Sequence, residues 1–232
     1  WEPADAPGGA PWPGKSFNFL APRGSIAAAA RTGGVDAASL ANNHALDYGR
    51  PALLGSLRQM RAADIAPFGA GASLGAALEP AIVTRGGLRI ALLGFNAIQP
   101  TGFWAGPSRA GNAPATRQAI ASAVSRARPK ADLVIAYVHW GNELERRPNA
   151  SQRALADAAL GAGADVVLGA HPHVLQPVAR QGRRLVAWSL GNFLFSPGSA
   201  VATHSAVLRL RLDVRGVRGH QLVPVRLRDT RP

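Results

Sequence analysis

Four short polar clusters are the part of this sequence best suited to chemistry. Each follows an apolar stretch, and their members are Asn43 with His44, His139, His171 with His173, and Asn192. Neutral imidazoles and amide oxygens bind borderline divalent ions such as Mn, Fe and Zn. Two such ions can clamp a phosphoryl group and activate a water, while a histidine not bound to metal protonates the leaving oxygen. The clusters therefore predict metal-assisted hydrolysis.

Each cluster taken alone also has a purely structural interpretation. An Asn-Asn-His sequence can form a turn, because asparagine tolerates the left-handed backbone conformation. His139 can be a hydrogen-bonded core histidine, because it follows a very apolar stretch. The pair His171 and His173 is more specific, since Pro172 fixes the backbone between two imidazoles. The joint occurrence of the clusters favours one shared metal site over several unrelated roles.

The elements that must position these residues are strands that alternate with helices. Strands are expected at 35–41, 65–68, 81–84, 88–95, 133–138, 166–168, 185–189, 206–213 and 222–227. Helices are expected from 25 until Gly33 and Gly34 close the first, at 51–63, at 116–128, and at 151–160 with Ser151 as its N-cap. In α/β sheets the ligand crevice lies at the carboxyl ends of the strands, where the clusters fall. We therefore predict a mixed α/β sandwich that forms a single domain over residues 1–232.

A long loop is predicted at 96–114, with Phe103 and Trp104 exposed on it. Long loops in compact domains are often functional, so this one is expected to shape specificity.

Composition excludes several other chemistries. The chain has 232 residues and no cysteine, which rules out thiolate metal sites and cysteine nucleophiles. Its net charge is +13, and 24 of its 26 basic residues are arginines spread along the whole chain. This charge fits either a codon bias towards arginine or an anionic partner, namely a polymer or a phosphoester substrate. Nucleic acid is not expected, because no basic and aromatic platform is visible. Nor is a membrane anchor visible, because no apolar run reaches about 18–20 residues.

Five longer strings surround the polar clusters: PWPGKSFNF (11–19), SLANNHALDYG (39–49), VHWGNE (138–143), GAHPHVLQPV (169–178) and WSLGNFLF (188–195). In these strings and their order the sequence resembles the bacterial capsule synthesis family named after CapA, the poly-γ-glutamate capsule proteins. The resemblance covers about residues 2–196. It implies the fold of the calcineurin-like metallophosphoesterases, a four-layer α/β/β/α sandwich.

The resemblance also implies roles for individual residues. Two divalent ions (Mn, Fe or Zn) would be bound by Asn43, His139, His171, His173 and Glu2, and His44 would be the catalytic proton donor. Asp47 and Glu143, with Asn192 at its strand end, are expected near the site without binding metal directly. Family members begin with a strand that ends in Gly-Asp, whose Asp is a ligand, and this sequence lacks that strand. The expectation is an N-terminally truncated domain in which one metal site is incomplete.

Two functions follow from these expectations. The first is a CapA-like protein of capsule or poly-γ-glutamate synthesis with a metal-dependent phosphoesterase-type site. The alternative is a non-catalytic accessory protein that binds an anionic envelope polymer during capsule synthesis or export. Under both, the resemblance implies contact with the capsule synthesis machinery and a location at the extracytoplasmic face of the cell envelope.

Overall fold

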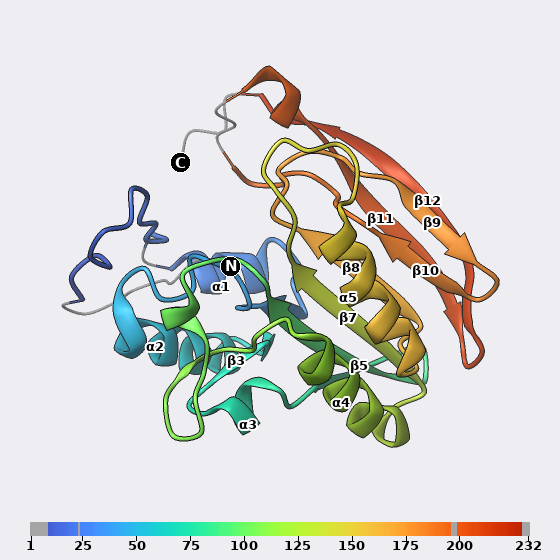
Figure 1. Ribbon diagram of the computed structural model, residues 1–232, viewed down its shortest axis with the longest axis horizontal. Coiled ribbons are helices and arrows are strands. Elements are labelled where there is room, and N and C mark those ends of the chain that lie inside the picture. The colour runs from blue at the N-terminus through green and yellow to red at the C-terminus, as the bar shows by residue number, and fades with distance from the viewer. Residues whose placement is uncertain (1–8, 23, 196–198, 229–232) are drawn as a thin grey trace.

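The computed structural model describes residues 9–22, 24–195 and 199–228. A six-stranded sheet lies at its centre (Figure 1). Across the sheet, the strands are β4 (Ala81–Arg85), β5 (Leu88–Asn96), β7 (Leu133–His139), β8 (Val166–Ala170), β10 (Arg184–Ala187) and β9 (Val178–Gln181). The inner strands β5, β7, β8 and β10 are parallel, and the edge strands β4 and β9 are antiparallel to their neighbours. The carboxyl ends of four strands therefore point the same way.

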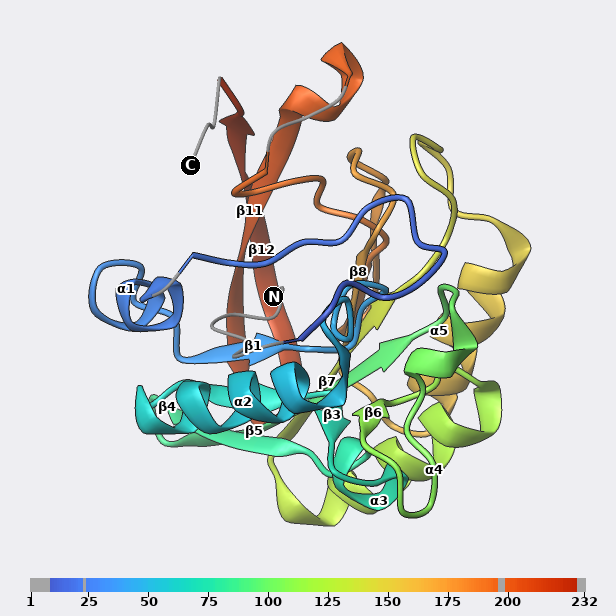
Figure 2. The ribbon, with the colours of Figure 1, turned by 90° about the vertical axis from the view of Figure 1, so that its left-hand side faces the viewer.

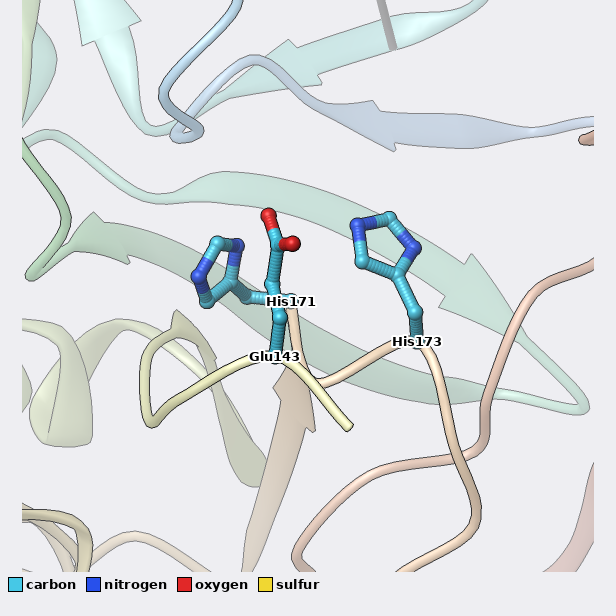
Figure 3. Close-up of side chains that lie close together, drawn as sticks. All are labelled: Glu143, His171 and His173. Atoms are coloured by element: carbon cyan, nitrogen blue, oxygen red, sulfur yellow. The ribbon is translucent and has the colours of Figure 1, made fainter. Parts of the chain in front are cut away.

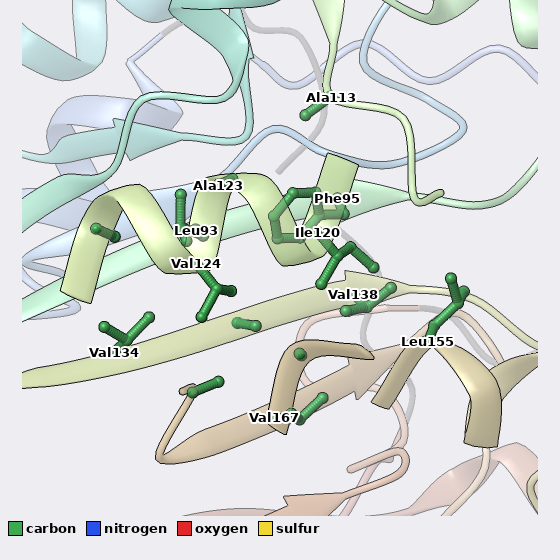
Figure 4. Packing of buried hydrophobic residues seen from close by; sticks show 14 of the residues in the cluster. Leu93, Phe95, Ala113, Ile120, Ala123, Val124, Val134, Val138, Leu155 and Val167 are labelled. Atoms are coloured by element: carbon green, nitrogen blue, oxygen red, sulfur yellow. The ribbon is translucent and has the colours of Figure 1, made fainter. Parts of the chain in front are cut away.

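Two helices, α4 (Arg117–Ala127) and α5 (Ala150–Gly161), cover one face of this sheet. Their apolar sides meet alternate residues of the central strands, including Leu93 and Phe95 of β5 and Val134 and Val138 of β7 (Figure 4). The run 133–138 is apolar throughout because β7 is covered on both faces.

A second β layer covers the opposite face. Its parts are the hairpin of β11 (His204–Asp213) with β12 (Gly216–Arg226) and the parallel pair of β1 (Ala37–Ser39) with β2 (Ala66–Phe68). Leucines of the hairpin pack on Leu133 and Ile135 of the central sheet. Helices α1 (Ser25–Arg31) and α2 (Gly49–Ala62) lie outside β1 and β2 (Figure 2). The α/β/β/α sandwich expected from the resemblance is confirmed.

Several details differ from the sequence-based expectations. Helix α5 begins after Asn149, not Ser151, because the Asn149 side chain and the Gln152 side chain form a reciprocal capping box. Strand β9 was not expected, since its residues are largely exposed and show no apolar alternation.

The predicted loop 96–114 contains the 3₁₀ turn η1 (Thr101–Phe103) and the strand β6 (Gly111–Asn112), which pairs with β3 (Ala70–Gly71). Phe103 is fully buried, contrary to prediction, because its ring packs edge-on against Trp12 at 4.9 Å between centroids. The remaining short elements are α3 (Leu74–Ala77), η2 (Arg128–Lys130) and η3 (Ala200–Thr203). Within the described ranges, no helix combines the length and the apolar character needed to cross a membrane.

Candidate metal centre

The register of the parallel strands brings His139 and His171 together. In the parallel ladder, Asn96, His139 and Ala170 lie side by side at the ends of β5, β7 and β8. Because His171 directly follows Ala170, its ring lies beside that of His139, with 4.8 Å between centroids. The convergence of these side chains therefore follows directly from the parallel sheet.

The loop after β8 carries His171 and His173 in an unusual backbone conformation. Both residues have positive φ, 98° and 60°, which is uncommon outside glycine and occurs often at functional sites. Leu144 donates its backbone N–H to Pro172 O at 2.8 Å and so ties the loop after β7 to this loop. As a result, the Glu143 carboxylate lies between the two imidazoles (Figure 3). One ligand-type atom from each of Glu143, His171 and His173 lies within 4.8 Å of the other two.

His173 is held in place by the segment after β10. Its Nδ1 lies 2.6 Å from Oδ1 of Asn192, and because an amide oxygen only accepts, this nitrogen donates. Asn192 is itself anchored, since its Nδ2 donates to Ala202 O at 3.2 Å. The ring of Phe195 stacks on His173 with 4.9 Å between centroids. The other ring nitrogen, Nε2, is thereby left with its lone pair, as in a metal-ligating histidine oriented by a neighbour.

The electrostatics of the centre favour neutral imidazoles. Burial lowers the pKa of His171 to about 4, with a further contribution from the charge of His173. Burial also holds the pKa of His139 well below its usual range, and the neighbouring His171 adds to this effect. Neutral imidazole is the form that binds metals. Moreover, Nδ1 of His171 is buried and finds no hydrogen-bond partner among the described residues, which is costly unless something occupies it. The donor set therefore fits a divalent cation.

A second wall of the centre follows β1. His44 donates its backbone N–H to Oδ1 of Asn42 at 2.8 Å, which closes a local turn. Asn112 of β6 donates to Asn42 O at 2.7 Å and pins this turn to the segment 96–114. Oδ1 of Asn43 then lies 2.9 Å from Nε2 of His139. Two ligand-type side chains from opposite walls thus already touch.

The side chain of His44 sits in a polar network beside Asn43. Its Nδ1 lies 2.7 Å from Oδ2 of the fully buried Asp47 and 2.8 Å from Nζ of Lys15. The ring of Phe19 packs edge-on against His44, with 4.6 Å between centroids. The fixed side of the imidazole is therefore the Nδ1 side. Among the described residues, none hydrogen-bonds Nε2.

The structure can be compared residue by residue with the predicted site. Asp47 contacts His44 and Asn192 contacts His173, so these two residues support the site from outside. The predicted side chains that the structure brings to one place are Asn43, His44, Asp47, His139, Glu143, His171, His173 and Asn192. Glu2 lies outside the described residues. Sequence reasoning missed Lys15, although this residue lies in the string PWPGKSFNF (11–19) and is one of only two lysines in the chain.

Comparison with known proteins agrees with this architecture. The fold is that of the metallophosphoesterase-type nucleotidases: a 5′-nucleotidase precursor of Thermus thermophilus superposes with a TM-score of 0.50 at 18% identity, over 82% of this chain and 38% of that one. The match to the model of the family described as bacterial capsule synthesis protein PGA_cap spans residues 2–197. The chain belongs to this family.

Two relatives carry capsule-related names. The PGA biosynthesis protein CapA of Bacillus subtilis is 35% identical over 193 residues, which are 83% of this chain and 51% of that protein. The capsule biosynthesis protein CapA of Bacillus anthracis is 32% identical over 208 residues, 88% of this chain and 51% of that protein. The chain thus spans about half the length of these curated relatives.

Proposed function

We propose that this chain is a metal-dependent hydrolase of phosphoester bonds that acts in capsule or poly-γ-glutamate synthesis at the cell envelope. Family membership and the names of the two Bacillus relatives support the capsule role and an association with the capsule synthesis machinery. One observation carries the catalytic part of the proposal. The carboxylate and two imidazoles of Glu143, His171 and His173 converge close enough to His44 for its charge to act on His171. Nδ1 of His44 is held by Asp47, and no described residue hydrogen-bonds its Nε2.

The metal would be held by side chains from the loops after β1, β7 and β8 and by His139 at the end of β7. Glu143, His171 and His173 form one group of donors, and Asn43 with His139 forms the adjoining pair. Imidazole and carboxylate donors suit Mn, Fe or Zn, and we assign one ion to each group. Glu143 supplies the carboxylate that such sites use, so we assign it a ligand role. A bound divalent ion would supply positive charge that polarises a phosphoryl oxygen.

His44 performs the proton transfer in this proposal. Its Nδ1 is engaged by Asp47 and Lys15, so Nε2 is the nitrogen available to a substrate. A proton held at Nε2 is given to the oxygen that leaves phosphorus, which avoids the release of an unprotonated alkoxide. Asp47 keeps the ring in this orientation through its contact with Nδ1.

Metal analysis and turnover test the proposal together. Purified protein should bind Mn²⁺, Fe²⁺ or Zn²⁺ and hydrolyse bis(p-nitrophenyl) phosphate. His44→Ala should lower kcat by about 10²-fold or more with metal content unchanged, because it removes only the proton donor. His171→Ala should lower both, because it removes a ligand. His220→Ala, in the exposed hairpin, is the control that should leave both unchanged. Wild-type protein without bound metal and without turnover would refute the proposal.

The second candidate is a non-catalytic protein that binds an anionic envelope polymer. It is favoured by the net charge of +13 and by exposed arginines on the β11–β12 hairpin, including Arg209, Arg211 and Arg218. Binding of poly-γ-glutamate that weakens steeply with salt, together with absent hydrolysis, would support it. Replacing the three arginines by glutamine should abolish such binding, whereas His171→Ala should not affect it.

A further inference from the structure

Lys15 occupies the junction between the proton donor and the metal-binding loop. Its ammonium donates to Asn43 O at 2.6 Å, contacts Nδ1 of His44 at 2.8 Å and forms an ion pair with Oδ1 of Asp47. The side chain is 15% exposed, and Nζ lies 5.4 Å from the centroid of the Phe103 ring. One cation therefore touches a metal-ligand candidate, the proton donor and the carboxylate behind it.

The segment that carries Lys15 is fixed independently of this ammonium. Trp12 donates its backbone N–H to Asp47 O at 2.7 Å, and Phe19 donates its N–H to Oδ2 of Asp47 at 2.8 Å. Asn18 closes the turn by donating from Nδ2 to Lys15 O at 3.1 Å. Backbone contacts on both sides thus hold the residue over the His44 loop.

The chemistry of the side chain matches this place. An ammonium has three donors and no acceptor, and two acceptor oxygens and a ring nitrogen surround this one. A guanidinium presents its donors in a planar fork and does not converge them on one point. The chain has 24 arginines and only two lysines, so a lysine at this position is unusual for the chain.

We infer that Lys15 is a positioning residue, which fixes the Nδ1 side of His44 and thereby aims Nε2 at the leaving oxygen. This inference rests on the proposed function insofar as His44 is the proton donor there. Lys15 and Asp47 both lie within hydrogen-bond distance of Nδ1 of His44, and they are paired with each other. This pair fixes the Nδ1 side of the ring and leaves the Nε2 side facing away from it.

The test compares Lys15→Met, Lys15→Arg and a control, Lys130→Met. The ammonium of Lys130 makes an exposed pair with Glu79. The substrates are bis(p-nitrophenyl) phosphate and diphenyl phosphate, whose poorer leaving group depends more on a proton donor. Lys15→Met should lower kcat about 10²-fold for diphenyl phosphate and less than about tenfold for the nitrophenyl ester, with KM and bound Mn²⁺ little changed. Lys15→Arg should fold and still fail to restore kcat.

An equal loss on both substrates, a loss of Mn²⁺ that accounts for the lost activity, or full activity of Lys15→Arg would overturn the inference. A readout independent of turnover is the ring ¹⁵N spectrum, with the His44 signals assigned through His44→Gln. In both Lys15 variants the Nδ1 shift of His44 should change, while Nδ1 of His173, held by Asn192, should not. An unchanged His44 spectrum would refute the positioning role even if the wild-type protein hydrolyses nothing, an outcome that would separately refute the proposed function.

Discussion

Asp47→Asn is the substitution that best measures how the network behind His44 contributes to stability. The Asp47 side chain is fully buried, its Oδ1 accepts from Lys15, and its Oδ2 accepts from the Phe19 N–H at 2.8 Å. Asparagine has the same shape, but one of its two oxygens becomes an NH₂ group, which only donates. In either orientation of the amide, that NH₂ group faces a donor.

The expected loss follows from these contacts. A hydrogen bond to a charged group contributes about 1.5–3 kcal/mol, and breaking a buried ion pair by changing one partner costs about 3–5 kcal/mol. Because Lys15 keeps some solvent contact, the lower part of that range applies, and we expect the free energy of unfolding to fall by about 3 kcal/mol. For a chain of 232 residues, about 2–4 °C per kcal/mol gives a Tm lower by about 6–12 °C.

Thermal and urea unfolding of the metal-free protein measure this change. The matched control is Asp36→Asn, because Asp36 pairs with Arg85 at 2.7 Å where the two side chains are 59% and 70% exposed. Exposed pairs contribute less than about 1 kcal/mol, so the control should unfold almost like the wild type. If Asp47→Asn were no less stable than Asp36→Asn, the buried network would contribute no net stability and the reasoning would be wrong.

Three further results are expected. Gly169→Ala should lower the free energy of unfolding in urea by about 3 kcal/mol, because its Cβ would clash with Trp188 O. Gly161→Ala, which has open space around its Cβ, should leave this free energy unchanged, and equal stabilities of the two variants would contradict the reasoning. Asp213 has its pKa lowered from 3.8 by a backbone N–H and then by arginines, so its contribution to stability is present above that value and lost as pH falls through the lowered pKa. Acid unfolding below about pH 4 should therefore be steeper for wild type than for Asp213→Asn, and parallel profiles would refute the assignment. Free Mn²⁺ at about 100 times its Kd should add about 2.7 kcal/mol and raise Tm in wild type, an effect that EDTA reverses and His171→Ala lacks. The same rise in the variant would exclude His171 as a ligand.

Sequence patterns predicted the regular parts of the fold well, because those parts depend on local rules. The apolar run 133–138 became the doubly covered strand β7, and the helix predicted at 116–128 became α4, with Thr116 as its N-cap. The failures have physical causes. Phe103 was expected on the surface because its neighbours are Gly and Pro, but the short 3₁₀ turn directs its ring into the core beside Trp12.

The predicted site followed from one rule, that parallel strands end at a common edge. The rule works for His139 and His171 because β7 and β8 are paired in register, so two residues 32 positions apart become neighbours. The rule does not predict the position of Glu143, because a turn with positive φ at Gly141 and Leu144 brings this residue to the site. No periodic pattern encodes such a turn, so sequence reasoning named the residue without its place among the imidazoles.

The position of Lys15 is even harder to predict from the sequence than that of Glu143. Its partners Asn43, His44 and Asp47 are 28 to 32 residues away, and the segment that carries it is neither helix nor strand. A residue positioned by loop-to-loop contacts leaves no mark on hydrophobic periodicity, because its place depends on donors and acceptors rather than on burial. The chemistry of the site is therefore arranged in two ways: strand ends bring the imidazoles together, and loop contacts orient them. Substitutions of the positioning residues Lys15 and Asp47 should accordingly change kcat more than they change metal affinity, whereas substitutions of His139 and His171 should change both.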